Sequence, residues 1–290
     1  MSGPLGEKSS IDCCIVSEPR HLSVDGSQWT DPWPAVFELA RAVSSDHWVL
    51  IGGLMVQLHH RLHDEVPTRA TRDIDTLARV EVTWRQHLTA LRSGLHALGY
   101  EDKDSIDASA PLHHMTRADG AGDMQVDFLI ADHVPPPAEQ ELPQPLPVQA
   151  PGGRNALERL LYVEVLTTQG PVVIAVPDLI GALELKIEAY RADSRDRERH
   201  LQDAVALAGL LDDAAPDPPL HGSAGTRLRR FLGWMGNDHR LSDAGISRDE
   251  ATDAALAVED LLGYEAGLDA GDGLGVASTR AASYRLFPSS

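Results

Sequence analysis

The sequence predicts an α+β protein with a mixed β-sheet flanked by helices, followed by a mainly helical C-terminal portion. Short strand-like runs alternate with helical patterns up to about residue 176, and helical spacing then dominates to about residue 262. Glycine and proline separate the segments. We expect a loose N-terminal arm over 1–30, a core over 31–176, a helical domain over 177–265 and a disordered tail over 266–290.

The elements of the core follow from apolar periodicity and turn residues. We expect helices over 35–44, 54–62 and 82–98, the last ending at the C-cap Gly99. Strands are expected at 49–51 and around 73–75, with hairpins formed by 113–116 with 125–130 about a turn at 119–122, and by 163–168 with 171–176. Residues 134–153 hold seven prolines and predict a loop or linker. C-terminal helices are expected over 178–193, 197–211, 224–236 and 248–262.

The tripeptide Asp73-Ile74-Asp75 carries the clearest chemical signal. In a strand, alternate side chains share a face, so both carboxylates point the same way while Ile74 turns into the core. Two carboxylates held so close repel each other, and a divalent cation such as Mg²⁺ carrying a substrate phosphate would explain the arrangement. The alternative is an acidic pair in an exposed loop. Residues placed to contact phosphate come earlier in the chain: Gly52, Gly53, Arg69 and Thr71.

Two further charged residues interrupt apolar segments. Asp127 lies within the strand-like run 124–130, where burial is costly unless the carboxylate is paired or bound to metal. The alternative is a solvent-facing strand end. Three aspartates from two neighbouring strands suit a two-metal phosphoryl-transfer site. Lys186 borders the apolar stripe of the helix that begins at Asp178, and its alternative is a surface lysine that snorkels to solvent.

Together these motifs resemble the polymerase-β-type nucleotidyltransferases, and within them the branch of the AbiEii-type toxins of type IV toxin–antitoxin systems. The resemblance covers about residues 45–212. It is carried by the Gly-Gly turn, Arg69-x-Thr71-x-Asp73-Ile74-Asp75, Asp127, Lys186 and Asp203. A longer gap between Gly53 and Asp73, and Gly-Gly where the minimal enzymes have Gly-Ser, favour the toxin-like branch over the aminoglycoside-modifying type. Thr71 is a candidate for the missing hydroxyl.

The resemblance implies a nucleotidyltransferase fold and transfer of a nucleoside monophosphate from an NTP to an acceptor hydroxyl, with Mg²⁺ or Mn²⁺. It implies a tRNA 3′ end or a protein as acceptor, and a cognate antitoxin as partner. Asp73, Asp75 and Asp127 would hold metal, and Asp127 would also help to deprotonate the acceptor. Gly52, Gly53, Arg69, Thr71 and Lys186 would bind the nucleotide, and Asp203 would orient Lys186 or the nucleotide. Two alternatives stay open: a small-molecule acceptor such as an aminoglycoside, and a non-catalytic regulatory protein of the same fold.

The composition restricts the possible partners. With 25 basic and 44 acidic residues the formal net charge is −19, which argues against broad nucleic-acid contact unless local patches compensate. Solubility or a basic partner protein would also explain the charge. The adjacent Cys13 and Cys14 cannot staple a fold, and together with the lack of a signal-peptide pattern or long apolar run they predict a cytoplasmic protein without membrane contact. The thirteen histidines show no zinc-binding spacing.

Overall fold

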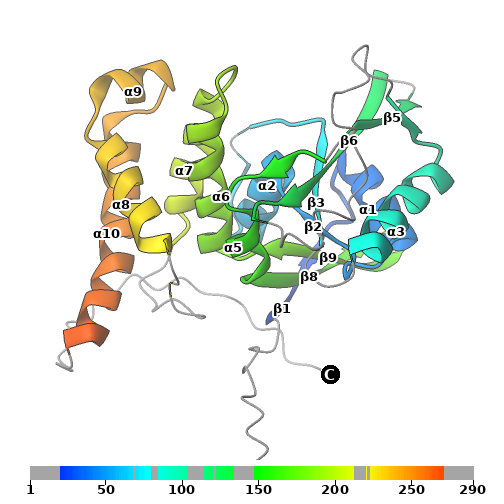
Figure 1. Ribbon diagram of the computed structural model, residues 1–290, viewed down its shortest axis with the longest axis horizontal. Coiled ribbons are helices and arrows are strands. Elements are labelled where there is room, and N and C mark those ends of the chain that lie inside the picture. Colours follow the sequence, from blue (N-terminus) through cyan, green and yellow to red (C-terminus); the bar gives the residue numbers. More distant parts are fainter. Residues whose placement is uncertain are drawn as a thin grey trace, which may run out of the picture.

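The computed structural model describes residues 20–67, 69–79, 84–103, 114–119, 122–133, 147–211, 220 and 223–270. It is an α+β structure with two mixed β-sheets flanked by helices, which confirms the predicted fold class. In Figure 1 the sheets and helices α1–α3 lie on one side of the molecule, and helices α7–α10 gather on the other. Helix α6 runs between these two groups.

The larger sheet has six strands and contains the acidic residues. Its order is β2 (Trp48–Leu50), β3 (Ile74–Ala78), β6 (Gly122–Ala131), β5 (His114–Asp119) and β4 (Glu101–Asp102), with β7 (Gln149–Ala150) paired to β6. The pair β3 and β6 is parallel, and β5 and β6 are antiparallel, as expected for the hairpin about residues 119–122. The register places Asp127 opposite Asp75 on one side and opposite His114 on the other. Residues opposite each other share a face, so these three side chains form a row across the sheet.

The smaller sheet has the order β1 (Arg20–Asp25), β8 (Leu160–Thr167), β9 (Gly170–Pro177). Strands β8 and β9 are the second expected hairpin. The expectation of a loose arm over residues 1–30 is wrong from Arg20 onward, because β1 pairs in parallel with β8 along its whole length. The alternation of polar and apolar residues in β1 is short, and its partner strand β8 lies about 140 residues away in the chain. The local sequence pattern therefore does not reveal this strand. Residues 1–19 lie outside the described part.

The helices are α1 (Trp33–Ala42), α2 (Gly52–Leu62), α3 (Trp84–Ala97), α5 (Gly153–Leu157), α6 (Leu179–Ala192), α7 (Glu198–Ala208), α8 (Ala224–Met235), α9 (Asp238–Asp243) and α10 (Arg248–Ala270). The sequence predicted all of them except α5 and α9, which are too short to show an apolar period. The expectation of a loop over 134–153 is wrong at its end, because β7 and the start of α5 lie there. Residues 134–146 lie outside the described part of the chain. Helix α10 continues into the range expected to be disordered, and residues 271–290 are not described.

The core consists of two hydrophobic clusters, and helix α6 contributes side chains to both. The first lies around the sheets and the second among α6–α10. Ala182 and Leu185 belong to the first cluster, whereas Leu183 and Ile187 belong to the second. Helix α6 is therefore buried on nearly all sides, and the expectation that Lys186 emerges at the edge of one apolar stripe is wrong: its side chain is 4% exposed.

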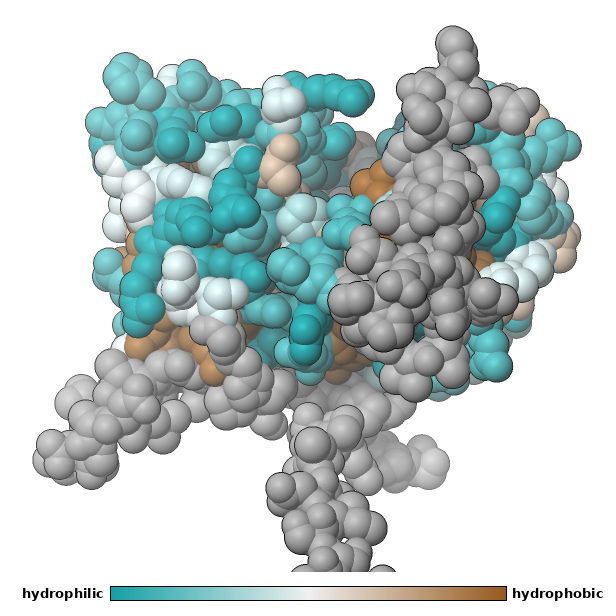
Figure 2. Space-filling view, in the orientation of Figure 1, coloured by the Kyte–Doolittle hydropathy of each residue, from teal (hydrophilic) through white to brown (hydrophobic). Residues whose placement is uncertain are grey.

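Figure 2 shows a face on which hydrophilic residues predominate over the C-terminal helices. In the described part of the chain, no helix is both long enough and apolar enough to cross a membrane.

Candidate active site

The acidic tripeptide lies at the start of β3. Asp73 directly precedes the strand and is exposed, Asp75 lies within it and is half-buried, and Ile74 between them is fully buried. Strand alternation thus sends Ile74 into the core and leaves the two carboxylates on the opposite face.

Gly52 is in direct contact with the Asp75 carboxylate. Its φ is +72°, a conformation that side chains disfavour, and a Cβ built on it would lie 1.8 Å from Asp75 Oδ2. Ile51 extends the contact, because its backbone N–H donates to the Asp75 carbonyl at 3.0 Å. Only glycine meets both the conformational and the spatial demand at this position, so the Gly-Gly turn brings the start of α2 against the acidic strand.

Gly53 brings the residues that precede β3 to the same place. A Cβ at Gly53 would lie 2.9 Å from Arg69 Nη2 and 3.0 Å from Thr71 Cβ. Helix α2 begins at Gly52 without a side-chain cap, so its first amide groups are available to an anion. The helix start, Arg69 and Thr71 therefore surround a position suited to phosphate, next to Asp75.

Asp127 is held from two sides on β6. Its Oδ1 accepts hydrogen bonds from His114 Nδ1 at 2.6 Å and from Gln125 Nε2 at 2.8 Å. On the other side, the Thr76 hydroxyl donates to the Asp127 carbonyl at 2.9 Å. These hydrogen bonds hold the Asp127 carboxylate in place beside Asp75, so Asp127 is not a freely moving acid at a solvent-facing strand end.

Electrostatics show that the carboxylates act on one another. The pKa of Asp75 is raised to about 6, and burial is the largest cause. Lys186 opposes the rise, Asp127 and Asp73 contribute to it, and Arg199 opposes it. Within the described residues, no three His, Cys, Asp or Glu side chains are grouped as a complete metal site. Mg²⁺, however, commonly takes one or two protein carboxylates and completes its coordination with substrate phosphate and water. The Asp75–Asp127 pair fits a cation that arrives with a phosphate ligand.

A buried ion-pair network faces this strand from the helical side. Lys186 Nζ on α6 lies 2.8 Å from Asp203 Oδ2 on α7, and both side chains are almost fully buried. Arg69 donates to both oxygens of Asp203, from Nε at 3.3 Å and from Nη2 at 3.1 Å. Burial alone would raise the pKa of Asp203, but Lys186 and Arg69 outweigh it and hold the pKa below its ordinary value.

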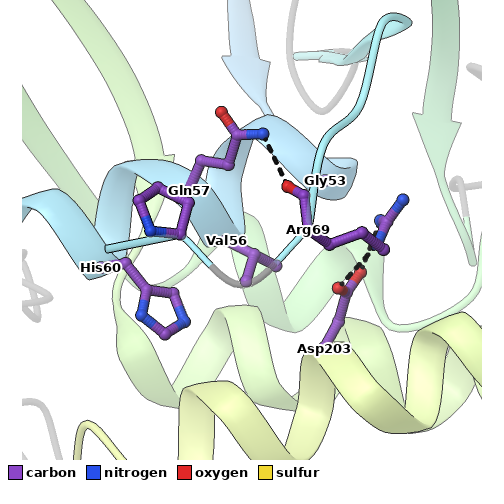
Figure 3. A pocket seen from close by; sticks show the side chains of 7 residues that line it. Gly53, Val56, Gln57, His60, Arg69 and Asp203 are labelled. Atoms are coloured by element: carbon purple, nitrogen blue, oxygen red, sulfur yellow. Dashed lines mark hydrogen bonds and ion pairs between the residues drawn. The ribbon is translucent and has the colours of Figure 1, made fainter. Parts of the chain in front are cut away.

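A small pocket connects the glycine turn with this network (Figure 3). Its lining consists of Gly53, Val56, Gln57, His60, Pro67, Arg69 and Asp203. The Gln57 amide donates to the Arg69 carbonyl at 2.9 Å, while the guanidinium of Arg69 reaches Asp203. Arg69 is therefore held at its backbone by α2 and at its side chain by α7.

Sequence reasoning missed two residues of this region, His114 and Gln125, which contact Asp127. It placed Arg199 on a mostly solvated helix face from which some arginines could still contact phosphate, and the structure shows that the charge of Arg199 acts on Asp75. The expected turn at 119–122 already contained a signal for His114, because pairing Asp119 with Gly122 places His114 opposite Asp127. Arg199 pairs with Asp193 at 3.8 Å and Asp196 at 3.5 Å. Its proximity to Asp75 depends on the packing of α7 against the core, which local sequence does not show.

Comparisons with known proteins identify the family of the chain. A family model described as "Nucleotidyl transferase AbiEii toxin, Type IV TA system" matches residues 35–269, a range that contains every site residue named above. Among solved structures, an antigenic nucleotidyltransferase-like protein from Paracoccidioides brasiliensis is 17% identical, with 74% of this chain and 92% of that chain covered and a TM-score of 0.45. No curated protein matches. The chain thus belongs to the nucleotidyl transferase AbiEii toxin family of type IV toxin–antitoxin systems, and it is a nucleotidyltransferase.

Proposed function

We propose that the protein transfers a nucleoside monophosphate from an NTP to a hydroxyl of a macromolecule, either a tRNA 3′ end or a protein, with the help of Mg²⁺ or Mn²⁺. The observation that carries the proposal is the pairing of Asp75 with Asp127 in adjacent strands, directly beside the uncapped start of α2. This arrangement supports the proposal, because carboxylates that suit a cation lie next to amides that suit a phosphate.

The metal-bound triphosphate would be held by two sets of groups, one that binds the cation and one that binds phosphate oxygens. Asp75 and Asp127 would hold the cation, which when bound neutralises phosphate charge and polarises the phosphoryl group. Asp73, exposed just before β3, would add negative charge next to them. The amides of Gly52 and Gly53 would bind phosphate oxygens. Thr71 and Arg69 would add a hydroxyl and a guanidinium, and Gly53 is the residue against which both pack.

Lys186 would stabilise the charge that develops on the phosphates during transfer. It is the opposing charge that lowers the pKa of Asp75 most, so it lies within electrostatic reach of the acidic strand. Asp203 would keep the ammonium group oriented, since the two are ion-paired at 2.8 Å. Asp127 would also help to deprotonate the acceptor hydroxyl, as a general base.

The net charge of −19 limits how the acceptor binds. A protein this acidic is poorly suited to grip RNA over a wide surface, so contact with tRNA would be confined to the 3′ end near the arginines of the site. The same acidity favours a cationic small molecule as the second candidate acceptor. Membership of a type IV toxin–antitoxin family implies a cognate antitoxin as partner.

The test is incubation with each labelled NTP in turn, Mg²⁺ and total tRNA, for the wild type and Asp75→Asn. Asp123→Asn is the matched control, because Asp123 is an exposed acid on the same strand as Asp127. Label on tRNA or on protein that requires Asp75 and not Asp123 would support the proposal and identify the base. Label on neither, with nucleotide still bound, would move the acceptor to the small-molecule class. Neither label nor nucleotide binding would contradict the proposal.

A further inference from the structure

His114 contacts a carboxylate of the site from a strand that has no other part in the proposed reaction. Its Nδ1 lies 2.6 Å from Asp127 Oδ1, and its side chain is 33% exposed. We propose that His114 is a positioning residue, which holds the Asp127 carboxylate in the orientation that binds the cation. The inference rests on the proposed function and assigns a role that the reaction residues above do not include.

The sheet places His114 for this role. It lies opposite Asp127 in the antiparallel pair of β5 and β6, and Asp127 lies opposite Asp75 in the parallel pair of β6 and β3. The order across the sheet is therefore His114, Asp127, Asp75, all on one face. Asp127 therefore has a hydrogen-bond donor, His114, on its β5 side and a carboxylate of like charge, Asp75, on its β3 side.

The contact has a defined direction. An ionised carboxylate only accepts hydrogen bonds, so Nδ1 of His114 carries the proton and donates it to Oδ1. Gln125 Nε2 donates to the same oxygen at 2.8 Å. Both donors thus fix Oδ1, and Oδ2 is the oxygen that these contacts leave for the cation. Without His114, the carboxylate would be held by Gln125 alone and could turn away from Asp75, because like charges repel.

Outer hydrogen-bond partners of metal ligands commonly contribute about 10- to 100-fold to metal affinity. We therefore expect His114→Ala to weaken the binding of Mn²⁺ at least about tenfold. His114→Asn should stay within about threefold of the wild type, because its amide nitrogen occupies nearly the position of Nδ1 and can donate to the same oxygen.

The measurement is the Mn²⁺ dissociation constant by electron paramagnetic resonance, in the presence of inorganic tripolyphosphate, the part common to all NTPs. His96→Ala is the matched control, since His96 also faces a carboxylate, Asp102 at 3.6 Å. Asp102 lies opposite Met115, so that pair is on the other face of the sheet from His114. Thermal melts without metal establish that each variant is folded.

The outcomes separate this inference from the proposed function. If His114→Ala binds Mn²⁺ as the wild type does while Asp75→Asn abolishes binding, the role of His114 is refuted and the metal site stands. If His114→Asn is as weak as His114→Ala, donation from Nδ1 is not what positions Asp127, and the inference is also refuted. A wild type that binds no Mn²⁺ under these conditions would overturn the proposed function itself.

Discussion

Replacing Gly52 by alanine tests the central contact of the site. The new Cβ would stand 1.8 Å from Asp75 Oδ2, whereas ordinary contact begins at 3.4 Å, so the two atoms must separate by about 1.6 Å. A displacement of about 1 Å at a reacting group can cost about 100-fold in rate. We expect Gly52→Ala to lower nucleotidyl transfer at least about 100-fold.

Stability should fall for two separable reasons. Alanine at a φ of +72° costs about 1–2 kcal/mol, and overpacking against Asp75 adds about 1–3 kcal/mol. Gly245→Ala is the matched control, because Gly245 has a φ of +64° and its Cβ would meet no atom closer than Gln202 Nε2 at 4.0 Å. It should show the conformational cost alone and retain activity.

The assays are urea unfolding and label transfer from NTP, measured for both variants under the same conditions. The reasoning predicts a larger loss of unfolding free energy for Gly52→Ala than for Gly245→Ala, and loss of activity only for the former. A Gly52→Ala protein with wild-type turnover, or one no less stable than Gly245→Ala, would refute the close contact between the glycine turn and Asp75.

Two further predictions concern the charged groups. The pKa of Asp75 is about 6 in the folded protein, whereas its ordinary value is 3.8. Between these two pH values the folded state binds more protons than the unfolded state. The metal-free protein therefore loses stability as the pH rises from about 4 to about 6. Asp75→Asn should therefore be inactive but more stable than the wild type at about pH 8. Urea titrations should show that this difference in unfolding free energy vanishes near pH 4. A difference that stays the same at both pH values would contradict the burial of the Asp75 charge. Lys186→Met should lose about 3 kcal/mol of unfolding free energy and at least about 100-fold in activity, because Asp203 is left buried with Arg69 alone. The double variant with Asp203→Leu should recover stability but not activity, and recovery of activity would show that Lys186 acts only through the ion pair.

Much of the fold was predictable because it depends on residues close together in the chain. Alternation in Asp73-Ile74-Asp75 placed both acids on one face, and the apolar period located α2, α6 and α7 to within a few residues. The turn about residues 119–122 set the hairpin of β5 and β6. Elements without a local period escaped, namely β1, the two-residue strands β4 and β7, and the short helices α5 and α9.

The sequence by itself determined which residue types stand at the start of β3 and after Gly52, and hence the acidic, glycine-supported character of the site. Only the tertiary structure decided which of those residues meet. Arg69 and Asp203 are 134 residues apart, and Lys186 reaches Asp203 because α6 is enclosed between two hydrophobic clusters. Periodicity records which face of an element is apolar, but not the partner against which that face packs. The pairing of charges across the site follows from that packing, since a buried charge requires a counter-charge that only the folded chain can bring to it.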